Sequence, residues 1–206
     1  MRAGRKRLLW AAGVAAVAVA AVVASAIATS GRNVSGHLNG YEEVPAISTG
    51  AKGSFTARLA RGGESIVWTL TYSGLEANAT QAHIHFGQRN VNGGISVWLC
   101  GNPNPNSTPP LVPPAGTQAC PPREASLTGT ITANNVVGPT GQGIAPGELG
   151  ELVRAIRSGV AYANVHSTMF PGGEIRAQLR PGKGAGRGSG KQRGSGKQRG
   201  RGNSHR

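Results

Sequence analysis

Apolar and polar residues alternate in short runs along most of this 206-residue chain. Between Ser65 and Tyr72, the larger apolar side chains fall at every second position. Because successive side chains of a β-strand point to opposite faces, this spacing predicts a strand with one face in a core. Comparable runs, separated by Gly, Asn and Pro, predict strands at residues 34–38, 51–59, 65–72, 80–86, 95–99, 126–131, 160–166 and 174–179.

A single segment shows the periodicity of a helix instead. Between Pro146 and Gly159, apolar residues recur at spacings of three and four, at Leu149, Leu152, Val153 and Ile156. Pro146 suits a first helical turn, and Gly159 suits the position just beyond the last turn. The chain therefore predicts a mainly β fold with one short helix packed on the sheet.

Residues 1–28 differ in composition from the rest of the chain and are excluded from the predicted fold. Four basic residues, Arg2, Arg5, Lys6 and Arg7, precede an apolar stretch of about 21 residues that ends in small side chains. This is the pattern of a secretory signal, and the stretch is also long enough to span a bilayer as an uncleaved anchor. In both cases we expect a secreted or membrane-anchored, extracytoplasmic protein.

Basic residues are concentrated at the two ends of the chain, whose formal net charge is +14. Residues 29–180 hold ten basic and eight acidic side chains, so the predicted domain is close to neutral. Residues 181–206 repeat the hexapeptide Gly-Ser-Gly-Lys-Gln-Arg and lack large apolar side chains, so we expect a disordered tail. Such a tail suits contact with anionic envelope polymers or lipids. Because it has no aromatic residue to stack on bases, it predicts no specific nucleic-acid partner.

The two cysteines, Cys100 and Cys120, bracket a Pro- and Asn-rich loop that has no strand or helix pattern. In an exported protein, two cysteines placed in this way predict a disulfide. Two free thiols are the alternative. Closing a loop of about 20 residues stabilises a fold by roughly 3 kcal/mol on the chain-entropy account.

Three of the five histidines fall in two of the predicted strands. His83 and His85 are two residues apart, so they point to the same face of one strand, and His166 ends another. If the three converge, they suit zinc with a water, and such His-rich sites also suit copper. The alternative is structural: the imidazoles tie the strands together through hydrogen bonds to the backbone or to Asn164 and Glu174.

A second group of polar residues accompanies these strands: Glu42, Glu43, Asn164, Glu174 and Arg176. We interpret it as a structural polar cluster. Pro45 cannot donate to a β ladder, so the two adjacent glutamates are expected in an edge or loop segment. Arg176 is expected to form an ion pair with a Glu. Nothing in the spacing singles out a catalytic pair, and no catalytic residue is predicted.

Four blocks of sequence resemble the CHRD domain, a family that is named after chordin and also occurs in bacterial exported proteins. They lie at residues 38–45, 72–75, 82–94 and 162–179, and the last contains Tyr-Ala-Asn-Val-His-Ser and Pro-Gly-Gly-Glu-Ile-Arg-Ala-Gln-Leu. The resemblance implies a single immunoglobulin-like β-sandwich or barrel over about residues 35–180. It implies no common enzymatic activity for bacterial members, and the growth-factor binding of chordin is not transferred, because a fold does not fix a function.

The leading hypothesis is an exported, non-enzymatic binding or structural module at the cell surface. Residues 1–28 are its signal peptide or anchor, 29–180 its CHRD-like β domain and 181–206 its tail. Its partner is an unknown protein or surface ligand. The alternative is a copper- or zinc-binding redox or hydrolytic protein that uses His83, His85 and His166.

Overall fold

The computed structural model describes residues 33–182. The predicted leader, residues 1–28, and nearly all of the predicted basic tail lie outside the described residues. Across residues 33–182, the structure contains no helix with the length and apolar character that crossing a membrane requires.

The described strands form one antiparallel sheet in the order β5-β4-β7-β8-β1-β2-β3-β6, and a short β9 pairs with β1. Each predicted strand is present, with ends that differ from the prediction by a residue or two. The strands are β1 (Asn33–Asn39), β2 (Lys52–Leu59), β3 (Ile66–Ser73), β4 (Ala79–Phe86), β5 (Gly94–Gly101), β6 (Ala125–Ile131), β7 (Ala161–Ser167), β8 (Ile175–Gln178) and β9 (Arg180–Pro181).

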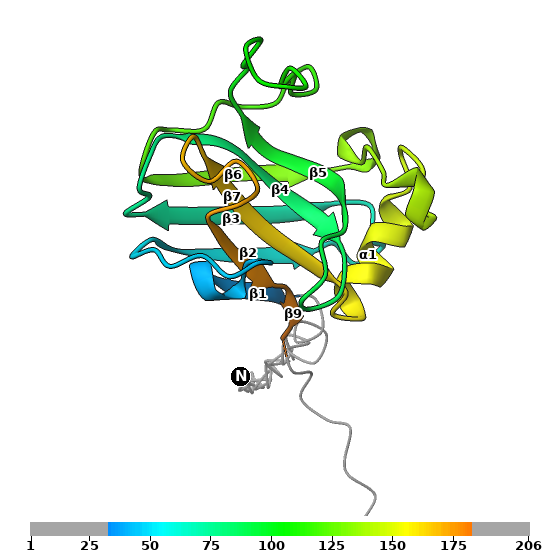
Figure 1. The fold of residues 1–206 in the computed structure, drawn as a ribbon. Helices are drawn as coiled ribbons and strands as arrows, with labels where there is room; N and C mark the ends of the chain where they lie inside the picture. The colour runs from blue at the N-terminus through cyan, green and yellow to red at the C-terminus, as the bar shows by residue number, and fades with distance from the viewer. Residues whose placement is uncertain (1–32, 183–206) are drawn as a thin grey trace, which may run out of the picture.

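The sheet folds over into two layers (Figure 1). Strands β4, β5 and β7 run obliquely across β1, β2, β3 and β6, and the two end strands of the sheet, β5 and β6, approach each other. Gln118 links these edges, because its side-chain amide donates to the carbonyl oxygens of Leu99 at 3.1 Å and Thr128 at 3.3 Å. The predicted mainly β sandwich or barrel with one short helix is therefore confirmed, as a nearly closed sheet.

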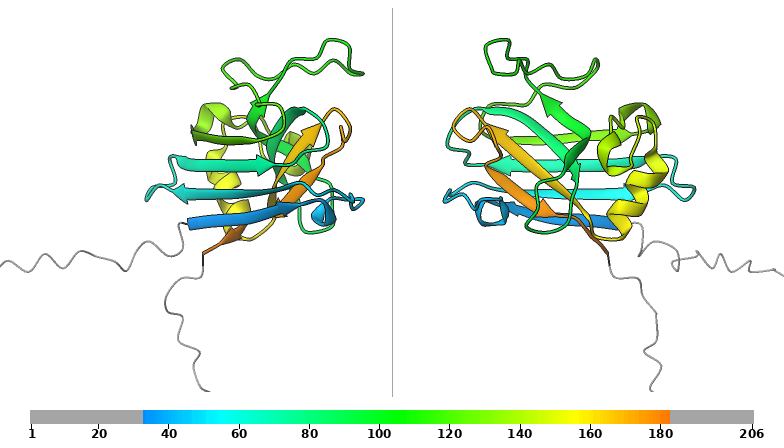
Figure 2. Two further views of the ribbon diagram at one scale, coloured as in Figure 1. Left: turned by 90° about the vertical axis from the view of Figure 1, so that its left-hand side faces the viewer. Right: turned by 45° about the vertical axis from the view of Figure 1, so that its right-hand side comes forward.

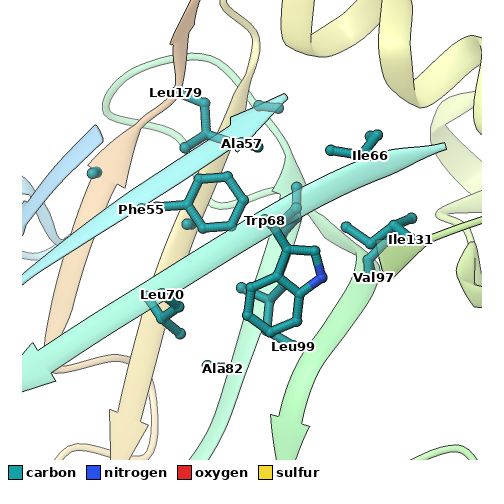
Figure 3. Close-up of a cluster of buried hydrophobic side chains, with 14 of the residues drawn as sticks. Phe55, Ala57, Ile66, Trp68, Leu70, Ala82, Val97, Leu99, Ile131 and Leu179 are labelled. Atoms are coloured by element: carbon teal, nitrogen blue, oxygen red, sulfur yellow. The ribbon is translucent and has the colours of Figure 1, made fainter. Parts of the chain in front are cut away.

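The core lies between the two layers (Figure 3). The alternating residues that predicted the third strand are buried as expected: Ile66, Trp68, Leu70 and Tyr72 are each at most 4% exposed. Phe55 of β2 stacks on Trp68 with ring centroids 6.4 Å apart. Strands β7 and β8 are buried along their whole length. They are therefore covered on both faces, and the face turned away from the core is the one that carries polar side chains.

The helix α1 (Leu149–Arg157) lies at one end of the two layers (Figure 2). Its end is the predicted one: Gly159 has a φ of 72°, and the N–H groups of Gly159 and Val160 donate to Ile156 and Ala155, as in a Schellman motif. The prediction that Pro146 lies in the first turn is wrong. Gly147, with a φ of 88°, turns the chain before the helix begins, and short 3-10 segments occur at Gly40–Glu42, Ala133–Asn135 and Thr140–Gln142.

Cys100 and Cys120 lie at disulfide-bonding distance, with their sulfur atoms 2.02 Å apart. Both are buried at the base of the Pro-rich loop, which projects from the domain (Figure 1). Asn102 reinforces the same junction, because its side-chain amide donates to Ala79 and Cys120 and its oxygen accepts from the Cys120 N–H.

We predict that the double substitution Cys100→Ala and Cys120→Ala lowers the free energy of unfolding by roughly 3 kcal/mol, because it frees a loop of about 20 residues in the unfolded chain. Urea denaturation of the variant, beside the wild type with and without reductant, measures the change. An unfolding midpoint equal to that of the unreduced wild type would contradict the stabilising role of this pair.

Candidate metal centre

The pairing of β4 with β7 brings the three predicted histidines to one place. His83 lies opposite Asn164 in this antiparallel register, and His85 lies two positions farther along β4. His166 follows Asn164 by two positions, so all four side chains share one face of the sheet. Ile84 points to the other face and is buried in the core.

The pairing of β4 with β5 is irregular around the same stretch. Register shifts occur between Ala82 and His83 and between Ile84 and His85. In this register His83 faces Trp98, whose ring lies 4.3 Å from the imidazole, centroid to centroid, at 85° to it. Bulges of this kind re-aim side chains and are over-represented beside functional sites.

The three imidazoles are close together and shielded from solvent. One nitrogen from each ring lies within 4.8 Å of the other two. Nδ1 of His83 is 3.3 Å from Nε2 of His166. His83 is 1% exposed, and His85 and His166 are each 7% exposed. The structure thus assembles, on the loop-covered face of the sheet, the three residues that the sequence identified as candidate ligands.

Backbone carbonyl groups fix where the hydrogen lies on two of the rings. Nδ1 of His85 is 3.0 Å from the Gly93 oxygen, and Nδ1 of His166 is 2.9 Å from the Pro171 oxygen. Because a carbonyl oxygen only accepts, each Nδ1 carries the hydrogen, and each Nε2 of the neutral ring holds a lone pair. Metal-ligating histidines commonly donate their far N–H to a backbone carbonyl in this way.

Burial keeps the three imidazoles neutral. It lowers the pKa of His85 and that of His166 to about 4. The pKa of His83 also lies well below its ordinary value, first because of burial and then because of the neighbouring His166 and His85. Neutral imidazole is the form that binds a metal ion, so at pH 7 the trio needs to lose no proton before binding one.

The hydrogen bonds around the trio are incomplete. Nε2 of His83 is buried without a hydrogen-bond partner among the described residues. Nε2 of His85 lies 3.1 Å from Oδ1 of Asn164. Because the hydrogen of this ring is on Nδ1, where it is donated to Gly93, two acceptor atoms face each other here. Buried polar atoms are normally paired, so an unpaired imidazole nitrogen beside two facing acceptors calls for a ligand or an explanation.

Tyr162 packs against His85, and Arg176 packs in turn on Tyr162. The Tyr162 ring is parallel to the imidazole, with centroids 4.6 Å apart. The guanidinium carbon of Arg176 lies 3.4 Å from the centroid of the Tyr162 ring. Arg176 also donates to the Val91 oxygen at 2.9 Å, and the Tyr162 hydroxyl accepts from the Gly93 N–H at 3.2 Å. This stack fastens the loop at residues 87–93 over the site.

The predicted polar cluster is divided among different environments. Asn164 joins the imidazoles. Glu42 forms a half-exposed ion pair with Arg89 at 2.6 Å. Glu174 is fully buried and accepts from the Thr49 hydroxyl at 3.0 Å rather than from a histidine.

The expected ion pair between Arg176 and a Glu is wrong. Among the described residues Arg176 has no salt bridge, because its donors are taken by Asn92 and the carbonyl groups of the covering loop. Burial raises the pKa of Glu43 to about 7. The positive charge of Arg176 lowers this pKa, but the effect of desolvation is larger. Gly173, at a φ of 126°, packs directly on this carboxyl group.

Sequence reasoning missed the residues that surround the trio. Tyr162 lies two positions before Asn164, so strand alternation alone could have placed it on the same face. Trp98 faces His83 across an irregular register, which the sequence does not indicate. The Gly93 and Pro171 carbonyl groups belong to loops, and their directions have no sequence signature.

Comparison with family models matches residues 34–179 to the CHRD domain. A search of curated proteins gave no significant match, and a search of solved structures gave none either. The matched segment contains β2 to β8, the helix and every residue of the candidate centre. The chain therefore belongs to the CHRD domain family.

Proposed function

We propose that this CHRD domain is a metal-binding module, in which His83, His85 and His166 hold one zinc or copper ion. The observation that carries the proposal is the convergence of three buried, neutral imidazoles. Two of them have the nitrogen nearest the cluster free to coordinate and the other nitrogen bonded to a backbone carbonyl.

The spacing supports a four-coordinate ion. Ligands about 2.0–2.1 Å from zinc in a tetrahedron lie about 3.3–3.4 Å apart. His83 Nδ1 and His166 Nε2 are already 3.3 Å apart. The largest spacing in the trio, at most 4.8 Å, requires a closure of up to about 1.4 Å, which side-chain rotation can supply.

A purely structural role for the trio explains fewer of the contacts. It accounts for the carbonyl bonds of His85 and His166, but it leaves the lone pair of His85 Nε2 facing the Asn164 oxygen. An unpaired buried polar atom costs about 1–3 kcal/mol. A metal ion accepts the Nε2 lone pair of His85 as a ligand. It also binds Nδ1 of His83, so that this ring carries its hydrogen on Nε2.

We further propose that the domain works outside the cytoplasm. The pairing of Cys100 and Cys120 supports an oxidising compartment, and the composition of residues 1–28 supports export. In this proposal the basic tail contacts anionic envelope polymers or lipids, and the partner of the domain is a protein or ligand at the cell surface.

We predict that protein purified without chelator retains about one equivalent of zinc or copper, and that His83→Ala, His85→Ala or His166→Ala each reduces it below about 0.1 equivalent, because a ligand is lost. His37→Ala is the matched control: His37 lies exposed on β1, away from the trio, and its loss should leave the metal content unchanged. Elemental analysis by mass spectrometry measures the content.

Thermal unfolding gives a second readout of the same prediction. Metal at 100 times its Kd should stabilise the wild type and His37→Ala by about 2.7 kcal/mol, and the trio variants by much less. The proposal would be contradicted by a wild-type protein that retains less than about 0.1 equivalent of metal and whose melting temperature does not change when zinc or copper is added.

We also predict that the metal-free protein, kept in chelator, becomes more stable as the pH rises from 5 to 6.5. The pKa values of the three histidines are lower in the folded than in the unfolded state, so the unfolded chain binds more protons in this window and acid favours unfolding. His85 and His166, whose pKa values fall to about 4, each contribute on the order of 2 kcal/mol, and His83 acts in the same direction. Glu43, whose pKa is raised to about 7, acts in the opposite direction and offsets part of the rise.

Urea denaturation of the wild type and of His85→Gln at several pH values tests this dependence. The variant should show a shallower rise, because one titrating imidazole is gone. A free energy of unfolding that is flat or falling between pH 5 and 6.5 in the wild type would show that the imidazoles are not held neutral in the fold.

A further inference from the structure

Asn164 occupies the centre of the histidine cluster. It lies directly opposite His83 on β4, two positions before His166 on its own strand, and its Oδ1 is 3.1 Å from Nε2 of His85. The side chain is 3% exposed. It therefore contacts His85 and shares one face of the sheet with His83 and His166. This position depends on the β4–β7 register, because a shift of one residue would turn the side chain to the other face.

The contact between Asn164 and His85 joins two acceptors. Nδ1 of His85 donates to Gly93, so Nε2 of the neutral ring has only a lone pair to offer. Oδ1 of Asn164 is also an acceptor. Two lone pairs 3.1 Å apart in a buried site repel each other, and a cation placed between them makes both favourable. Turning the amide to present its NH₂ group is the competing solution.

The distances favour the cation. The separation of 3.1 Å between His85 Nε2 and Asn164 Oδ1, and that of 3.3 Å between His83 Nδ1 and His166 Nε2, are both close to the edge of about 3.3–3.4 Å expected between neighbouring ligands of tetrahedral zinc. The three imidazole nitrogens and the Asn164 amide oxygen would fill the four coordination positions of a tetrahedral zinc ion.

We infer that Asn164 is the fourth ligand, and that the domain binds zinc in a closed site of three nitrogens and one oxygen. This inference rests on the proposed metal-binding function. Structural zinc sites fill all four positions with protein atoms, whereas catalytic ones keep a position for water. A closed site, buried under the loop at residues 87–93, has no position for a substrate. The zinc then braces β4 against β7, and the domain acts as a non-enzymatic module.

The test uses the full chain and two probes, Zn²⁺ for affinity and Co²⁺ for coordination. Zinc affinity is measured by competition with a chelator in the wild type, Asn164→Ala and Asn164→Asp. We expect Asn164→Ala to bind zinc at least about 10-fold more weakly. Asn164→Asp should bind at least as tightly as the wild type, because a carboxylate oxygen replaces the amide oxygen. Gln81→Ala is the matched control, since this amide lies opposite His166 but bonds to none of the imidazoles, and its affinity should be unchanged.

Azide added to the Co²⁺ proteins reports whether a coordination position is open. The visible spectrum of the wild type should not respond, and that of Asn164→Ala should change as azide enters the vacated position.

If the wild-type spectrum responds to azide, or if Asn164→Ala matches the wild type in zinc affinity, Asn164 is not a ligand although the trio still binds metal. If the wild type binds neither Zn²⁺ nor Co²⁺, both this inference and the proposed function fail. Should Asn164→Ala not fold, the azide response of the wild type and the affinity of Asn164→Asp decide the question.

Discussion

The antiparallel pairing of β4 with β7 is the constraint on which the candidate centre depends. It sets His83 opposite Asn164 and places His85 and His166 on the same face, so four possible ligands converge without any contribution from a flexible loop. Ile84 and Val165 lock this register, because they occupy the core face of the same two strands and are completely buried. A slip of one residue would move the imidazoles into the core and these apolar side chains out of it.

The covering segments convert a polar sheet face into a buried site. The loop at residues 87–93 is held by the buried guanidinium of Arg176, and Gly93 and Pro171 supply the carbonyl oxygens that orient His85 and His166. Burial under these segments lowers the pKa values of His85 and His166, and the hydrogen bonds to the Gly93 and Pro171 carbonyl groups offset only part of that effect. The sequence blocks that resemble the family therefore contain both candidate ligands and residues that surround them, since the block at 162–179 contains Tyr162, Asn164, His166 and Arg176.

Much of this architecture follows from periodicity. Alternation in residues 65–72 and the three- and four-residue spacing in the helix arise from burial against one core, so they are visible in the sequence. The same rule places His83 and His85 side by side. The convergence with His166 is different, because it depends on which strands become neighbours, and strand order is a property of the whole chain.

Two expectations from the sequence failed because local rules compete with tertiary contacts. Pro146 suits a first helical turn, but the positive φ of Gly147 makes a turn there and delays the helix. Arg176 suits an ion pair, but in the folded domain it stacks on Tyr162 and binds loop carbonyl groups instead. Neither outcome could be read from composition or spacing.

An X-ray structure of zinc-loaded protein, with anomalous data at the zinc edge, shows whether a metal ion lies between β4 and β7. We expect one strong anomalous peak surrounded by His83 Nδ1, His85 Nε2, His166 Nε2 and Asn164 Oδ1. A structure without a peak at this position, in which the imidazoles are hydrogen-bonded to the Asn164 amide, to each other or to water, would overturn the proposed centre.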